Sequence, residues 1–161
     1  MTSDTNEKLH VQIGQVKTGR EGQLLTAILG SCIGLGILHP DKGVYGLAHC
    51  LLSRSRSSSD EISGRHVDQA VKSLVSLMQI SEDEIRKLKG ICVGGANMTM
   101  PKDTSPERLV GSVNARTAYK ALRELCIRNI YEDVGGAQGR QVNIDCTTGE
   151  FEVLIIPRMG V

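Results

Sequence analysis

The chain has 161 residues, and its 19 lysine and arginine residues nearly balance 18 aspartate and glutamate residues, which gives a formal net charge of +1. This length fits a single domain that needs neither disulfides nor a structural metal to fold. The balanced charge and the aromatic content of 2% give no support to nucleic-acid binding, because phosphate backbones select basic surfaces and single strands stack on aromatic rings.

The sequence contains no run of 18 apolar residues, and its start lacks the basic and apolar segments of a secretory signal. We therefore expect a cytoplasmic protein without direct membrane insertion. The five cysteines are odd in number and form no CxxC pair. This pattern predicts free thiols rather than disulfides or a structural zinc site.

The N-terminal part of the chain is predicted to be rich in strands. Residues 1–8 are polar and predict a flexible tail, and residues 9–161 are expected to form one domain. Apolar residues alternate over 9–17, with an irregularity at Gly14, which predicts one strand. A second strand is expected over 24–29.

The central part of the chain begins with a strand expected over 44–52 and continues into a Ser-rich polar segment, 53–64, which predicts a mobile loop. Apolar residues then recur at spacings of three and four. They predict an amphipathic helix that begins near Ser63 and ends before Ser81. A short helix is expected over 81–88.

The C-terminal part predicts a second amphipathic helix and further strands. Residues 90–97 predict a strand that ends in a glycine turn. The helical spacing runs from Ala118 to Cys126, with Pro106 and Gly111 before it. Strands are expected over Asn129–Val134, 140–146 and Phe151–Ile156. This order predicts a mixed α/β (α+β) domain with strands at both ends and two main helices between them.

Cys32 has the sequence setting of a nucleophile. It lies between Gly30-Ser31 and Ile33-Gly34, in a segment where three glycines stand among apolar residues. Such glycines indicate close backbone packing, and they let peptide N–H groups turn toward a bound carbonyl oxygen. The remaining cysteines in apolar surroundings are expected to be buried thiols: Cys92, Cys126 and Cys146.

A thiol with an ordinary pKa near ~8.5 needs a base, and an activated nucleophile titrates several units lower. His49 lies beside the small residues Gly46 and Ala48 in an expected strand, which leaves space around its imidazole. The alternative is a hydrogen-bonded histidine of the core. The group that would orient the imidazole is left open by spacing, because three residues fit by type: Thr26, Ser31 and Asp68.

Two other kinds of site receive little support from the sequence. A metal site built from Cys32, His39, His49 and Cys50 would match no usual zinc spacing. No glycine-rich phosphate-binding motif is present. Arg140 is the basic end of a glycine-rich loop, which is either a functional loop or a hairpin turn with a solvated arginine.

Six short motifs together resemble the CheD family of chemoreceptor glutamine deamidases. They occur in the family's order and span almost the whole chain. They are Thr26-Ala27-Ile28-Leu29-Gly30-Ser31-Cys32-Ile33-Gly34, Gly46-Leu47-Ala48-His49, Arg65-His66-Val67-Asp68, Gly94-Gly95-Ala96-Asn97-Met98, Gly111-Ser112-Val113-Asn114 and Gly135-Gly136-Ala137-Gln138-Gly139-Arg140.

The resemblance implies a layered sandwich of mixed β-sheet and two main helices, related to the toxin-deamidase fold. It implies hydrolysis of particular chemoreceptor glutamines to glutamate and ammonia, in chemotaxis adaptation, with no metal or organic cofactor. Cys32 would be the nucleophile, His49 the general base and acid, and Thr26 the group that orients His49. Gly30 and Ser31 would contribute to the oxyanion hole and Arg140 to substrate contacts. The implied partners are cytoplasmic helices of chemoreceptors and a CheC-type phosphatase.

The chain departs from the family pattern at four positions. A basic residue common before the glycine turn is replaced by the apolar Ile91 or Cys92. Ser53, His66 and Val113 stand where a proline, an aromatic residue and an arginine are usual. These departures leave the proposed triad intact but affect recognition of substrate and partner. The alternative function is therefore a regulatory module of the same fold that binds a CheC-type phosphatase or a receptor with little turnover. A thiol hydrolase of another family or a redox-sensing thiol is the third interpretation.

Overall fold

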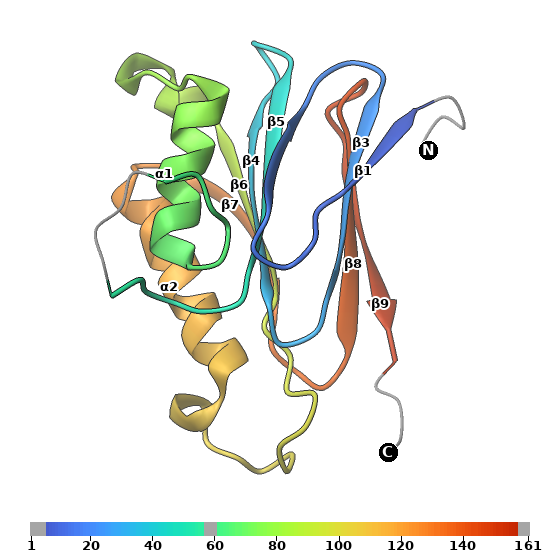
Figure 1. Ribbon diagram of the computed structural model, residues 1–161, viewed down its shortest axis with the longest axis vertical. Coiled ribbons are helices and arrows are strands. Elements are labelled where there is room, and N and C mark those ends of the chain that lie inside the picture. Colours follow the sequence, from blue (N-terminus) through green and yellow to red (C-terminus); the bar gives the residue numbers. More distant parts are fainter. Residues whose placement is uncertain (1–5, 57–60, 158–161) are drawn as a thin grey trace.

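Two β-sheets pack face to face, and two helices cover the outer side of the larger sheet, so that the molecule has three layers (Figure 1). The computed structural model describes residues 6–56 and 61–157. Part of the expected tail and part of the expected mobile loop lie outside the described residues. The layered α+β architecture predicted from the sequence is confirmed.

The smaller sheet has the strand order β1-β3-β8-β9. In this sheet β1 and β3 are parallel, whereas the other neighbours are antiparallel. β1 begins at Glu7, so the last two residues of the expected tail belong to a strand. The four strands are Glu7–His10, Gln23–Leu29, Gly139–Asp145 and Phe151–Ile156.

The larger sheet has the strand order β2-β5-β4-β6-β7, with β6 and β7 parallel and the other neighbours antiparallel. The single strand expected over 9–17 is wrong, because β1 and β2 belong to different sheets. Gly14, with φ of 86°, lies in the segment where the chain passes between them. The strands of this sheet are Val16–Gly19, Val44–Cys50, Ile33–His39, Lys89–Gly94 and Asn129–Val134.

The helices α1 and α2 span Val67–Met78 and Val110–Glu124. α1 therefore begins four residues after the predicted start at Ser63, and α2 begins well before its apolar repeat. Gly111 permits this early start, since a Cβ there would lie 2.5 Å from the carbonyl carbon of Gly95. Two short 3₁₀ helices precede β6 and α2: Glu82–Lys87 and Pro106–Arg108.

Side chains of the larger sheet alternate between two apolar cores. On β4, Ile33, Leu35 and Ile37 pack toward the helices, whereas Gly34 faces the smaller sheet. A Cβ at Gly34 would lie only 2.8 Å from Leu29 Cδ1, and this contact confirms the close packing expected for the glycine-rich segment. We call the side of the larger sheet that meets the smaller sheet its inner face.

Candidate functional site

The turn between β3 and β4 carries Cys32 and is fixed by its backbone carbonyls. Gly95 N–H donates to the Cys32 carbonyl at 2.9 Å, and Ala96 N–H donates to the Gly30 carbonyl at 3.0 Å. The N–H groups of Ser31 and Cys32 donate no backbone hydrogen bond within the described residues. These two N–H groups thus have no backbone acceptor in the described structure, and their role in holding an oxyanion stays a prediction of the sequence.

Gly94 explains why the glycine turn after β6 fits against the Cys32 turn. Its φ of 112° lies in a region that L side chains rarely adopt, and a Cβ at this position would collide with the Cys32 carbonyl oxygen. Two of the family-like motifs, far apart in sequence, therefore form one rigid unit around the thiol.

His49 lies on the inner face of the larger sheet, on the same side as Cys32. In the β4–β5 register His49 is opposite Gly34, which follows Cys32 by two residues. Side chains two residues apart share a face of the sheet, and diagonal neighbours of this kind are about 7–8 Å apart before their side chains reach toward each other. Both side chains are nearly buried, with 7% of Cys32 and 5% of His49 exposed.

The imidazole of His49 is oriented by a backbone carbonyl. Its Nδ1 lies 2.9 Å from the Val11 carbonyl oxygen. Since a carbonyl oxygen only accepts, Nδ1 carries the proton and Nε2 keeps a free lone pair. Burial lowers the pKa of His49, and the bond to Val11 opposes this shift only in part. His49 is therefore a neutral base at neutral pH.

The burial of Cys32 raises the pKa of its thiol. No hydrogen bond joins this thiol to His49 in the described part of the chain, so the free protein holds a neutral thiol beside a neutral imidazole. This state differs from the thiolate with a strongly lowered pKa that the sequence analysis expects of an activated nucleophile.

Thr26 lies on β3 and is buried, but its hydroxyl faces away from His49. Its neighbours Leu25 and Ala27 belong to the core between the sheets, so alternation places Thr26 on the opposite side of the smaller sheet. Its Oγ1 donates to Asn143 Oδ1 at 2.6 Å. The structure therefore does not bring the hydroxyl to the imidazole.

The backbone of Thr26 does connect to the site through Val11. Val11 N–H donates to the Thr26 carbonyl at 2.8 Å, and the Val11 carbonyl in turn meets His49. Val11 is the orienting group that sequence reasoning missed. A backbone acceptor leaves no side-chain signature in a sequence, so no residue type could have indicated it.

We expect Thr26→Ala to lower the stability by about 1 kcal/mol, the usual net loss of one hydrogen bond, and to reduce turnover far less than Cys32→Ala. The backbone link to Val11 survives the substitution. Urea unfolding and steady-state kinetics measure the two effects, with Thr26→Ser as the matched control. A loss of turnover as large as that of Cys32→Ala would place the hydroxyl in the chemistry.

Asp68 and Arg140, two further candidates, are engaged within the chain. The Asp68 carboxylate accepts from Ser55 N–H at the start of α1. The Arg140 guanidinium donates to the Gly135 and Gln138 carbonyls and pairs with Asp133 at 3.1 Å. Arg140 is 7% exposed and closes its own loop, although its Nε has no partner.

The family-like motifs converge at one end of the molecule. Figure 1 shows the β3–β4 turn, the segment after β6, the β7–β8 connection and the start of α2 at the lower end of the sheets. Asn97 N–H donates to the Gly136 carbonyl at 2.8 Å. Asn114 on α2 donates to the Leu51 carbonyl at 2.9 Å and accepts from Ser53 Oγ at 2.7 Å. Ser53, one of the departures, thus holds the chain that leaves His49.

No group of three or more His, Cys, Asp and Glu side chains within the described part of the chain has a metal-binding arrangement. No helix within residues 6–56 and 61–157 has both the length and the apolar character needed to cross a bilayer.

The expectation that Cys126 is buried in a helix core is wrong. Cys126 follows the end of α2 with φ of 71° and is exposed. The left-handed conformation typical of a helix C-terminus turns the chain away from the apolar repeat. Cys92 and Cys146 are buried as expected, and burial raises their pKa to about 12 and about 11.

We expect iodoacetamide to label Cys126 quickly in the native protein and to spare Cys92 and Cys146, because alkylation needs an accessible thiolate. Peptide mass spectrometry after a timed reaction measures each site. Labelling in urea serves as the control for intrinsic reactivity. Fast native labelling of Cys92 or Cys146 would contradict their burial.

The comparisons with known proteins agree with these motifs. The family model described as CheD chemotactic sensory transduction matches residues 51–154. The chain is 48% identical to the probable chemoreceptor glutamine deamidase CheD 2 of Ruegeria sp. (strain TM1040), over 95% of this chain and 94% of the relative. It is 32% identical to the probable chemoreceptor glutamine deamidase CheD of Natronomonas pharaonis, over 94% of this chain and 90% of the relative.

Among solved structures, YlmD from Geobacillus stearothermophilus superposes on 76% of this chain and 51% of its own length, with a TM-score of 0.45 and 15% identity. The sequence matches are far stronger, since they extend over nearly the full length of both proteins. On the family match and on these relatives, the chain belongs to the CheD family.

Proposed function

We propose that this protein is a protein-glutamine deamidase, which hydrolyses glutamine side chains of chemoreceptors to glutamate and ammonia in chemotaxis adaptation. One observation carries the proposal: Cys32 and His49 share the inner face of the larger sheet, with Nε2 of His49 free to accept a proton. The names of the relatives, chemoreceptor glutamine deamidase, support the same substrate class.

The first half of the reaction forms a thioester. His49 Nε2 takes the thiol proton as Cys32 Sγ attacks the side-chain amide carbon of glutamine. The carbonyl electrons move onto oxygen, and the free N–H groups of Ser31 and Cys32 stabilise the oxyanion. His49 then gives its proton to the amide nitrogen, which leaves as ammonia.

The second half releases glutamate. His49 accepts a proton from water, whose oxygen attacks the thioester carbon, and the same N–H groups hold the second oxyanion. Collapse of this intermediate breaks the carbon–sulfur bond, and the proton returns from His49 to the Cys32 sulfur. The Val11 carbonyl keeps Nδ1 protonated throughout and stabilises the imidazolium less than a carboxylate would.

A regulatory binding module is the second candidate function, and a specific observation favours it. Burial holds Cys32 and His49 in their neutral forms, and the two groups are not hydrogen-bonded to each other in the described structure. Such a resting site gives little turnover unless substrate brings the two groups together. A CheC-type phosphatase is the regulatory partner that we propose for either function, in the cytoplasm.

The deciding experiment incubates the purified protein with a purified cytoplasmic receptor fragment and measures glutamine-to-glutamate conversion by mass spectrometry. Cys32→Ala is the control, because spontaneous deamidation produces the same mass change. Conversion that depends on Cys32 supports the deamidase. A receptor that binds but is not converted by the wild type would favour the binding module.

A further inference from the structure

A small apolar groove lies beside the proposed active site, between the chain that leaves β5 and the start of α2. Its volume is about 230 Å³, and Leu52, Leu109, Val110 and Val113 provide its apolar lining. Leu52 is 38% exposed and Val110 is 54% exposed. Two apolar side chains that line the groove are therefore in contact with water.

The groove is linked to the catalytic turn through the backbone, because Gly111 of α2 packs against Gly95, whose N–H donates to the Cys32 carbonyl. Leu52 follows His49 by three residues. Asn114, which also lines the groove, holds the Leu51 carbonyl and the Ser53 hydroxyl. The segments that form the groove, on the helix side of the larger sheet, therefore also hold the end of the strand that carries His49.

Three arginines lie in or close to the groove and outnumber its one acidic residue. Arg108 lines it, Arg54 follows Ser53, and Arg116 lies one helical turn after Val113. These three arginines are exposed, and none makes an ion pair within the described residues. Glu107 is the one acidic residue of the lining.

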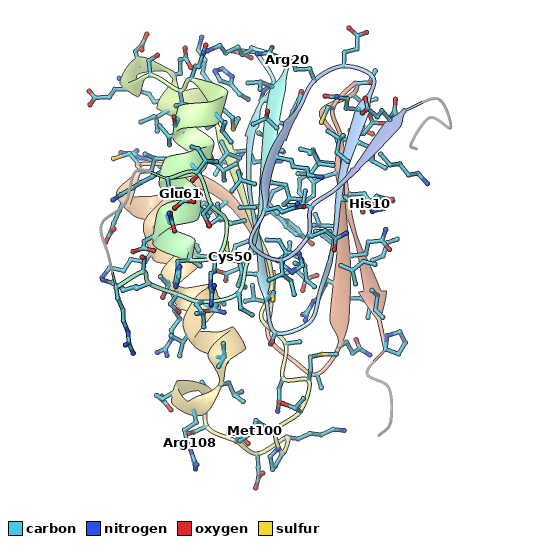
Figure 2. All side chains as sticks on the ribbon, in the orientation of Figure 1. His10, Arg20, Cys50, Glu61, Met100 and Arg108 are labelled. Atoms are coloured by element: carbon cyan, nitrogen blue, oxygen red, sulfur yellow. The ribbon has the colours of Figure 1, made fainter. Side chains whose placement is uncertain are left out.

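Figure 2 shows Arg108 at the lower end of the molecule, the end at which the β3–β4 turn of Figure 1 also lies. Met100, which is 40% exposed, lies at the same end. The combination of exposed apolar and unpaired basic side chains is typical of a surface that binds an amphipathic acidic segment.

We propose that this groove binds an acidic amphipathic helix of the substrate, next to the glutamine that reacts at Cys32. An apolar side chain three or four residues from the target glutamine lies on the same face of such a helix and enters the groove. Carboxylates beside it meet Arg54, Arg108 and Arg116. This inference rests on the proposed deamidase function and assigns it a specificity site.

The test compares the wild-type protein with its Val110→Asp and Arg108→Glu variants. For each, the kinetics of deamidation of a purified receptor fragment are measured. We expect each change to raise KM by about tenfold while kcat changes little, because the groove acts in binding. The matched controls are Leu154→Asp on β9 and Arg123→Glu at the far end of α2, which are expected to keep the wild-type KM. Higher ionic strength should raise KM less for Arg108→Glu than for the wild type.

Two further measurements distinguish weaker binding in the groove from a damaged site or fold. The rate of Cys32 alkylation and the thermal unfolding of each variant report whether the site and fold are intact, and Leu52→Asp replaces any variant that fails to fold. Absence of turnover in the wild type contradicts the deamidase function itself. Wild-type turnover with an unchanged KM in the groove variants overturns the groove inference and leaves this surface to another partner.

Discussion

Cys32→Ala is expected to lower the deamidation rate by at least about 10⁴-fold, the scale on which hydrolases lose activity when their nucleophile is removed. No other described cysteine combines a backbone turn with free N–H groups and a histidine on the same face of the sheet. The side chain is small and 7% exposed, so the alanine variant should fold. Ammonia release and glutamate formation, both measured on a receptor fragment, check the result.

Cys126→Ala is the matched control for the nucleophile, because Cys126 is an exposed thiol that lies after the C-terminal end of α2 and has no role in the proposed chemistry. We expect it to keep wild-type kinetics and to lose the fast alkylation signal. Substantial turnover by Cys32→Ala, above the spontaneous rate, would remove Cys32 from the mechanism. Equal loss in both variants would point to a structural effect of thiol removal.

His49→Ala is expected to lower kcat by roughly 10²–10⁴-fold, the range that general acid–base catalysis contributes. The pH dependence of the wild-type kcat/KM should also report the protonation of His49. His49 must be neutral to accept the thiol proton, and burial lowers its pKa from 6.5. The acid limb of kcat/KM is therefore expected below pH 6.5, with activity rising as the pH increases through the lowered pKa.

The ionisation state of the Cys32 thiol distinguishes a neutral Cys32–His49 pair from an ion pair. Burial raises the pKa of Cys32 above 9.0, so we expect no thiolate absorbance from Cys32 at neutral pH in the free protein. The spectrum of Cys32→Ala is the reference for this difference measurement. A thiolate signal that appears near pH 6 would contradict the neutral resting state and would indicate a preformed Cys32–His49 ion pair.

The positions of the main elements follow from local patterns. Period-two and helical spacing predict most strands and both helices, because one side of each element must face an apolar core. The wrong predictions occur where the apolar pattern of a segment does not show the direction that the chain takes in the folded protein. Between β1 and β2 the chain passes from one sheet to the other in the segment that contains Gly14. Cys126 has apolar neighbours in the sequence but lies beyond the end of the helix that would have buried it.

For the site, the sequence by itself determined the chemical groups: the Cys32 thiol among glycines, the His49 imidazole, and the motifs that resemble one family. Only the tertiary structure decided how they act. Strand register places Cys32 and His49 on one face, Val11 supplies the acceptor for Nδ1, and the Thr26 hydroxyl turns to Asn143. The physical reason is that side-chain chemistry is encoded residue by residue, whereas backbone acceptors, burial and the face of a strand depend on which distant segments pack together.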